Sequence, residues 1–196
     1  MNMAVLLSGS GRTLDNFHER IQQGTMQGSI GVVVANTPTA LGLKKAVNYG
    51  YPAFHAGKNS DINVILADHG IDLVLLAGFL KLYEPPAELR RAVLNIHPSL
   101  IPSFCGSGFY GMRVHRAVKA RGVKVSGCTV HFANEVYDEG PIVVQHCVPV
   151  GEEDTAEDIA SRVFAAECEA YPEAINLVHH RGVDSFWNKI NRGESL

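Results

Sequence analysis

Residues 3–11 read MAVLLSGSG, five apolar residues that run directly into a glycine-containing polar turn. An apolar run of this length before a turn predicts a short, fully buried strand at Met3–Leu7. A polar segment of helical length follows, and then a second apolar run, Ile30–Ala35, which ends before Asn36-Thr37-Pro38. The chain therefore opens with a predicted strand–helix–strand unit.

The same alternation continues through the first half of the chain. Further strands are predicted at Asp72–Ala77 and Ala92–Ile96, and helices at Leu41–Tyr49, Ile62–His69 and Pro86–Arg91. Strands that alternate with helices are typical of a parallel sheet covered by helices. We therefore expect an α/β fold of Rossmann-like type, mostly parallel, with helices on both faces.

After Pro98 the pattern changes. A long loop rich in Gly, Pro and aromatic residues spans Ser99 to Met112, and a helix is predicted at Val114–Arg121. Lys124–Phe132 and Ile142–Pro149 are predicted strands joined by an acidic turn, which favours a hairpin and hence a mixed sheet.

The last long element is a predicted core-packing helix. Asp154 and Glu157 have the spacing of a capping box at its start. Apolar residues then recur on one helical face, and Pro172 is expected to kink or interrupt it. We expect a single domain over residues 1–196, in which residues 1–100 form a phosphate-binding half and residues 101–196 supply a loop, the hairpin and this helix.

The composition excludes several classes of function. The net charge is -3, with 17 basic and 20 acidic residues, so no broad basic surface for nucleic acid is expected. No signal peptide or membrane span is apparent, and the four cysteines lack metal-ligand spacing. We expect a cytoplasmic protein without a metal, and without a nucleic-acid or membrane partner.

The glycine motif after the first strand favours an anion site. Glycines let backbone N–H groups approach a phosphate, and a helix N-terminus adds a favourable dipole. A dinucleotide fingerprint would need glycine at Leu14, so the motif indicates one phosphate and not a cofactor cradle. A plain strand-to-helix turn remains the alternative.

Asn95 and His97 are the first candidates for chemistry. They lie two residues apart on a predicted strand, so both side chains leave the same face. An amide donor beside an imidazole suits a developing oxyanion and a proton transfer near neutral pH. Read alone, the local pattern favours a structural histidine, satisfied at a strand end, over a catalytic one.

The acidic turn between the two hairpin strands adds Asp138. If Asp138 folds back onto His97, its carboxylate would raise the pKa of the imidazole and fix its tautomer. A solvated acidic turn is the alternative.

The segment NIHPSLIP, residues 95–102, closely resembles the signature of the folate-dependent formyltransferases. Leu76–Leu80, Val130–Phe132 and Asp138–Ile142 also fit the pattern of that family, and the resemblance runs from Met3 to about His180. It implies the formyltransferase fold and transfer of a formyl group from 10-formyltetrahydrofolate, as cosubstrate, to the amine of glycinamide ribonucleotide in purine biosynthesis.

The resemblance also implies roles for individual residues. Asn95, His97 and Asp138 match the catalytic trio, and Glu167 matches the acid near the ribose of the substrate. The substrate phosphate would be held by Gly9, Ser10, Gly11, Arg12 and Thr13. The folate positions match Leu80, Lys81, Leu82, Tyr83, Val93, Ala133, Asn134, Glu135, Val136 and Tyr137.

Several alternatives stay open at this point. The catalytic trio does not identify the acceptor, so an amino-sugar nucleotide could replace glycinamide ribonucleotide. A formyltransferase acting on methionyl-tRNA would be expected to carry a further C-terminal domain and a basic surface. A non-catalytic module that binds a phosphometabolite could use the glycine motif alone. A homodimer is compatible with the resemblance.

Overall fold

The computed structural model describes residues 1–192, apart from the side chains of residues 190 and 191. Residues 193–196 of the expected domain lie outside the described residues. The strands are β1 (Asn2–Leu7), β2 (Ser29–Ala35), β3 (Ala53–His55), β4 (Leu73–Leu76), β5 (Val93–His97), β6 (Val125–Phe132) and β7 (Ile142–Pro149). The helices are α1 (Arg12–Gln22), α2 (Leu41–Asn48), α3 (Asn59–Asp68), the short 3-10 helix η1 (Ala87–Leu89), α4 (Met112–Arg121), α5 (Ala156–Arg181) and α6 (Val183–Asn191).

The strands form one mixed sheet with the order β3-β2-β1-β4-β5-β6-β7. The neighbours from β3 to β5 pair in parallel, whereas β6 pairs antiparallel with both β5 and β7. Helical connections join the strands from β1 to β4, and right-handed crossovers of this kind produce a parallel sheet with helices on both faces. The predicted fold class is confirmed.

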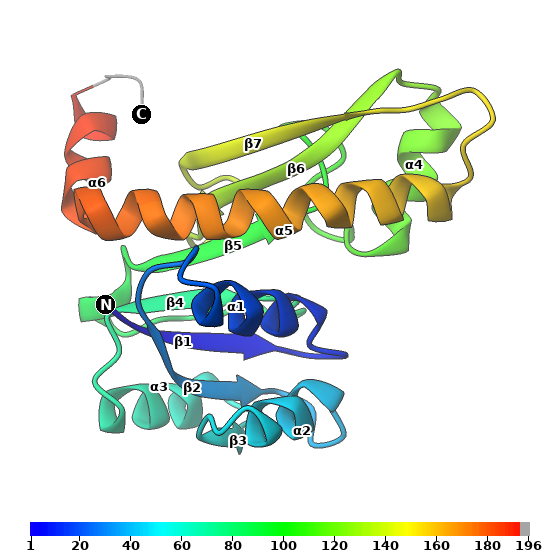
Figure 1. The fold of residues 1–196 in the computed structure, drawn as a ribbon. Coiled ribbons are helices and arrows are strands. Elements are labelled where there is room, and N and C mark those ends of the chain that lie inside the picture. The colour runs from blue at the N-terminus through cyan, green and yellow to red at the C-terminus, as the bar shows by residue number, and fades with distance from the viewer. Residues whose placement is uncertain (193–196) are drawn as a thin grey trace.

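The centre of the sheet is the core of the molecule. All four residues of β4 are buried, as are all those of β1 except its first, Asn2. On one face, α1 and α5 lie side by side, and α5 runs along β6 and β7 (Figure 1). The fully buried Tyr171 of α5 directs its hydroxyl at the carbonyl oxygens of Leu94 and Leu76, at 2.9 and 3.2 Å. This long helix is therefore fixed to the middle of the sheet.

The order of the strands reverses direction beside β1. The chain moves outward from β1 to β3 and then returns to β4 on the other side of β1. At such a reversal, the loops after neighbouring strands diverge and leave a crevice at the carboxyl ends of the strands. The loops after β1 and β4 are joined there by a hydrogen bond from Ser8 N–H to the Gly78 carbonyl oxygen.

The expected interruption at Pro172 is wrong, because α5 continues through this residue to Arg181. Proline cannot donate to the carbonyl of Cys168, one turn earlier. That carbonyl oxygen instead accepts a hydrogen bond of 3.0 Å from the side-chain amide of Asn16 in α1. A neighbouring helix thus supplies the donor that Pro172 lacks.

Some element boundaries also differ from the prediction. The capping box of α5 is formed one residue later than expected, by Thr155 and Asp158, while Asp154 pairs with Arg162. Only a 3-10 turn forms within the helix predicted at 86–91. Two elements were not predicted. The strand β3 has only three residues, too few to show an apolar alternation, whereas α6 was missed although its nine residues exceed the eight of α2.

Candidate active site

Asn95 and His97 lie near the carboxyl end of β5 and are positioned by the neighbouring strand. The antiparallel register sets Asn95 opposite His131 and His97 opposite Thr129 of β6. Directly opposed residues bring their side chains together, and the Asn95 amide nitrogen lies 3.1 Å from His131 Nε2. The buried His97 directs Nε2 at the carbonyl oxygen of Phe104, at 3.0 Å.

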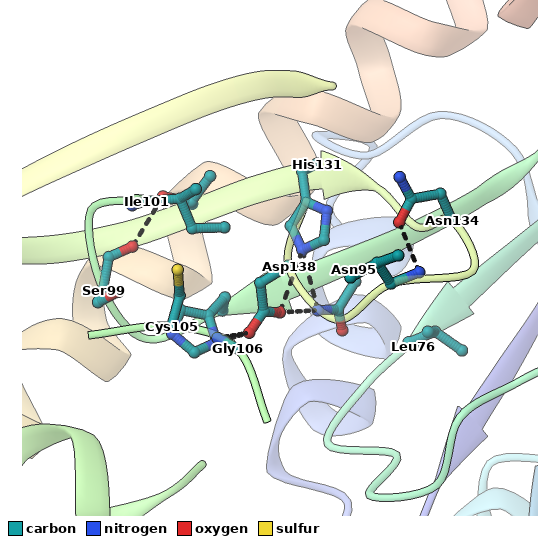
Figure 2. Close-up of polar contacts among 12 residues, drawn as sticks. Leu76, Asn95, Ser99, Ile101, Cys105, Gly106, His131, Asn134 and Asp138 are labelled. Atoms are coloured by element: carbon teal, nitrogen blue, oxygen red, sulfur yellow. Dashed lines mark hydrogen bonds and ion pairs between the residues drawn. The ribbon is translucent and has the colours of Figure 1, made fainter. Parts of the chain in front are cut away.

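Asp138 reaches both of these side chains from the turn between β6 and β7, as the sequence led us to expect. Its Oδ2 lies 3.3 Å from His97 Nδ1 and accepts a 2.8 Å hydrogen bond from the Gly106 N–H. Its Oδ1 accepts a weaker, 3.5 Å hydrogen bond from Asn95. Figure 2 shows the carboxylate of Asp138 between Gly106 on one side and Asn95 and His131 on the other.

The hydrogen-bond network assigns the tautomer of His131. Its Nδ1 lies 3.0 Å from the carbonyl oxygen of Phe132, and this contact requires a proton on Nδ1. In the neutral ring Nε2 is then an acceptor for one N–H of the Asn95 amide. In the protonated ring Nε2 faces Asp138 Oδ1, which lies 3.6 Å away. The second N–H of Asn95 is directed at Asp138. The amide of Asn95 is therefore held in one orientation.

Two non-glycine residues among those described have a left-handed backbone, Phe104 with φ 51° and Asp138 with φ 62°. Both contact His97, one through its carbonyl oxygen and the other through its carboxylate. Backbone conformations of this kind cost free energy and persist where the surrounding contacts hold them. The backbone around His97 is therefore tightly specified.

Burial determines the direction in which the pKa of His97 is shifted from its ordinary value. Burial lowers it, and this outweighs the opposing effects of Asp138 and of the Phe104 carbonyl. Asp138 does raise the pKa of His97, as expected from the sequence, but the effect of burial is larger and the pKa is lowered overall. Because both imidazole nitrogens face oxygen acceptors, a neutral ring with one proton satisfies only one of them, and uptake of a second proton completes the other contact.

The pKa of Asp138 is lowered. Burial alone would raise it, but the contact with His131, the charge of His97 and the Gly106 N–H act together in the opposite direction. A buried carboxylate is thus kept ionised beside an imidazole, and such a pair can hold and pass on a proton.

These residues border a cleft of about 530 Å³ at the carboxyl ends of β1, β4 and β5. All five predicted phosphate residues, Gly9 to Thr13, line it together with Asn95, His97, Asp138 and Glu167. Gly11 has φ 71°, and an added Cβ would lie 2.7 Å from the Gly42 Cα. Glycine is therefore needed there to let α2 pack against the start of α1.

Arg12 of α1 and Glu167 of α5 both line the cleft. The Arg12 guanidinium lies 3.9 Å from the centre of the Phe164 ring, one turn before Glu167 on α5. Burial raises the pKa of Glu167 to about 7, and the positive charge of Arg12 opposes this rise. The predicted ribose residue is therefore a carboxyl group that titrates near neutral pH.

A second pocket, of about 750 Å³, lies on the other side of the β6–β7 turn. Seven of the ten predicted folate residues line it. Leu80 and Tyr137 line the first cleft instead, and Lys81 lines neither, since its ammonium donates to the Gly57 carbonyl oxygen. The seven are Leu82, Tyr83, Val93, Ala133, Asn134, Glu135 and Val136.

Several site residues were not predicted. His131 orients Asn95, and Thr129 holds the loop after His97 by donating to the Ser99 carbonyl oxygen at 2.7 Å. The buried His115 of α4 lines the first cleft, and its Nδ1 has no hydrogen-bond partner within the described part of the chain. The roles of His131 and Thr129 become visible only from the pairing of β5 with β6. His115 is a single histidine in the sequence and belongs to no motif that would have indicated it. The fourth, Trp187 of α6, lines the second pocket.

Neither a metal site nor a membrane span was found in residues 1–192. No three His, Cys, Asp or Glu side chains described there are grouped so that they could hold a metal ion. No helix in that range is long and apolar enough to cross a membrane.

Comparisons with known proteins agree with this geometry. The sequence model of the formyl transferase family matches residues 1–175. A chloroplastic phosphoribosylglycinamide formyltransferase from Vigna unguiculata is 42% identical over 189 residues, which cover 90% of this chain and 60% of the relative. The chain thus spans less than two thirds of the length of that relative. The phosphoribosylglycinamide formyltransferase of Haemophilus influenzae is 36% identical, with 88% of this chain and 84% of the relative covered.

The crystal structure of glycinamide ribonucleotide transformylase 1 from Symbiobacterium toebii has the same fold. It superposes with a TM-score of 0.84 at 38% identity, and the match covers 92% of this chain and 89% of that one. The chain belongs to the formyl transferase family.

Proposed function

We propose that this member of the formyl transferase family transfers the formyl group of 10-formyltetrahydrofolate to the amine of glycinamide ribonucleotide, in de novo purine biosynthesis. One observation carries the proposal: the Asn95, His97 and Asp138 side chains meet at the edge of a cleft that also contains the glycine loop. The names of the relatives from Vigna unguiculata and Haemophilus influenzae support this acceptor. A non-catalytic phosphate-binding module would have no need of the trio.

The phosphate of the acceptor would bind to the loop Gly9–Thr13. This loop leads into α1, whose first N–H groups have no partner within the helix and whose dipole favours an anion. Glu167 lines the same cleft and would accept hydrogen bonds from the ribose hydroxyls when its carboxyl is ionised. This arrangement directs the acceptor amine toward β5.

The folate would occupy the second pocket with its pteridine ring. The turn after β6 separates the two cavities: Ala133 to Val136 line the second pocket, and Tyr137 and Asp138 line the first cleft. A folate bound behind this turn would present its formyl group beside Asp138. Two substrates held on either side of the trio can react without a covalent intermediate.

In the proposed reaction, the acceptor amine attacks the formyl carbon. Asn95 stabilises the oxyanion, together with His97 when its ring has taken up a second proton between Asp138 and the Phe104 carbonyl oxygen. The bond from the formyl carbon to the folate nitrogen then breaks. Of the two contacts of the Asn95 amide, the one to Asp138 is longer, at 3.5 Å, so this weakly engaged N–H is the one that would donate to the oxyanion. His97, or a water held by Asp138, passes the proton from the amine to the departing folate nitrogen.

The cellular setting is also part of the proposal. The cysteines are unpaired in the described chain, as expected in a reducing compartment, and we propose that the protein acts in the cytoplasm. A homodimer is the proposed assembly, and sedimentation of the purified protein tests it.

The direct test is an assay of the purified protein with 10-formyltetrahydrofolate and glycinamide ribonucleotide, in which release of tetrahydrofolate is followed. His97→Ala and Asp138→Asn are compared with His180→Ala, an exposed histidine at the end of α5. We expect undiminished turnover by the intact protein and by His180→Ala, and strongly reduced turnover by the other two variants. No turnover by the intact protein overturns the acceptor, and an amino-sugar nucleotide is then assayed in its place. Full activity of His97→Ala and Asp138→Asn overturns the mechanism.

A further inference from the structure

We propose that Trp187 of α6 is a wall of the folate pocket and packs its ring against the pteridine. This inference rests on the proposed function, since it assigns the occupant of the second pocket. It adds a binding residue from the C-terminal helix, which lies beyond the residues 1–175 matched by the family. The family match therefore gives no reason to expect this residue in the site.

The lining of the pocket combines apolar and aromatic side chains with charged ones. Trp187 lines it together with Tyr83, Val93 and Val136, while Arg91 and Glu135 add charged groups. A flat heteroaromatic ring with polar edges fits such a lining, because its faces need apolar or aromatic contact and its edges need hydrogen bonds. A pteridine is a ring of this class, and the turn that carries Asp138 borders the same pocket.

The ring of Trp187 is held in place before any ligand binds. Its indole N–H donates a 3.0 Å hydrogen bond to the Arg91 carbonyl oxygen, so the only donor of the side chain is already used. The ring centre lies 5.6 Å from that of Phe132, the last residue of β6. Phe132 also packs against the buried Phe186, the neighbour of Trp187 on α6.

Two consequences follow from this support. The Arg91 guanidinium lies over the Trp187 ring, 5.7 Å from its centre. Because its N–H is also occupied, Trp187 offers a ligand only the aromatic surface that Arg91 and Phe132 leave uncovered, which allows stacking but no hydrogen bond. Because the ring is fixed on β6 and on the loop before β5, little side-chain freedom is lost on binding. Trp187 should therefore contribute to folate affinity, and it should not contribute to the chemical step.

The kinetic test compares Trp187→Ala with Trp187→Phe in the full-length protein. Loss of one aromatic stacking partner weakens binding of a flat base by about tenfold. We expect Trp187→Ala to raise the KM for 10-formyltetrahydrofolate about tenfold, with kcat and the KM for glycinamide ribonucleotide changed by less than about twofold. Trp187→Phe keeps an aromatic face and should recover most of the affinity. Phe54→Ala, which removes an exposed aromatic ring from β3, is the matched control and should change nothing.

Fluorescence gives an independent readout, because Trp187 is the single tryptophan of the sequence. Titration of the intact protein with tetrahydrofolate should change the tryptophan emission, whereas glycinamide ribonucleotide alone should leave it unchanged. Calorimetric titration with tetrahydrofolate, applied to the intact protein and to Trp187→Ala, then measures the loss of affinity without turnover.

The outcomes separate the two proposals. If the intact protein binds no tetrahydrofolate, the proposed function fails and the assignment of the pocket fails with it. If the intact protein binds tetrahydrofolate and Trp187→Ala binds it equally well, the function stands and this inference is overturned. An equal rise in both KM values would mean general damage to the site, and it would also overturn the inference.

Discussion

At the scale of single residues, Asp138 is the centre of the site. Its carboxylate contacts His97, Asn95 and the N–H of Gly106, and its backbone is left-handed. Aspartate tolerates this conformation better than most residues do. The partners of the carboxylate more than offset the effect of burial on its pKa. Replacement of Asp138 by asparagine, which has nearly the same size but no charge, therefore tests the role of the charge alone.

Asp138→Asn is expected to lower kcat by a factor of about a hundred to a thousand, the range of a lost acid–base group. Asparagine keeps the size and still accepts from Gly106, but it cannot stabilise a protonated His97. The measurement is kcat at saturating substrates, with circular dichroism to establish folding. Asp61→Asn, on the exposed surface of α3, serves as the control. Activity within a few-fold of the intact protein would contradict the role given to this charge.

Glu167 should make stability depend on pH in an unusual direction. Its pKa is 4.5 in the unfolded chain and about 7 in the fold. Between these values the folded protein holds a proton that the unfolded chain has released, so the free energy of unfolding decreases as pH rises through the window. Glutamine does not titrate. Glu167→Gln should therefore gain roughly 2 kcal/mol relative to the intact protein as pH rises from about 4.5 to about 7.

Urea unfolding of both proteins across that range measures this difference. Glu153→Gln, an exposed position before α5, is the control and should show no such trend. A constant difference between Glu167→Gln and the intact protein at all pH values would show that the carboxyl is not protonated by burial.

At the scale of elements, the hairpin of β6 and β7 determines where Asp138 lies. The register shifts between Val130 and His131, and Gly140 returns the chain close against β6. A Cβ at Gly140 would lie 1.6 Å from the Phe132 carbonyl oxygen, a distance that no side chain can occupy. Glycine is required at Gly140 by this close approach, and not by a left-handed conformation.

Gly140→Ala should therefore displace the turn and cost about 3 kcal/mol or more, the range of severe backbone or packing conflicts. Activity should fall with stability, because Asp138 belongs to the displaced turn. Thermal unfolding and turnover are measured beside Gly57→Ala, where an added Cβ meets nothing within 4 Å. Equal melting temperatures for the two variants would contradict the packing argument.

The contact between α1 and α5 depends on the missing N–H of Pro172. Asn16→Ala should remove the side-chain donor to the Cys168 carbonyl and cost about 1 kcal/mol. In a Pro172→Ala background the helix supplies its own N–H, so the same change should cost less. A double-mutant cycle by urea unfolding measures this coupling. Additive effects would mean that Asn16 and Pro172 act independently.

At the scale of the whole molecule, the site is assembled from both halves of the chain. The glycine loop and β5 come from residues 1–100, whereas Asp138, Glu167 and Trp187 come from the remainder. Both halves contribute to one continuous sheet, and α5 packs on α1 as well as on β6 and β7 (Figure 1). We propose that the chain folds as a single domain.

A single domain should unfold in one cooperative transition. Emission of Trp187 follows the packing of α6 on β6, while far-ultraviolet circular dichroism follows all helices and strands. The two probes should give coincident urea curves with the same midpoint. Separate midpoints would mean that the hairpin and α6 unfold independently of the parallel part of the sheet.

The sequence by itself determined the fold class, most of the elements and the members of the trio. Apolar periodicity is a local property, so the strand at Met3–Leu7 and the hairpin could be read directly, whereas the three-residue β3 was too short to show it. The resemblance in residues 95–102 identified Asn95 and His97 because a family signature is also local.

Only the tertiary structure decided how these groups act on one another. Asn95 lies 36 residues from His131 and 43 from Asp138, and no local pattern reports which strand pairs with β5. The lowered pKa of His97 depends on burial, which the sequence does not give for one residue. Trp187 lines the second pocket and Lys81 does not. The positions of α6 and of the loop after β4 depend on contacts with residues far away in the sequence, which no local pattern reports. The sequence could therefore name candidate residues for the chemistry, whereas it could not give their geometry and charge.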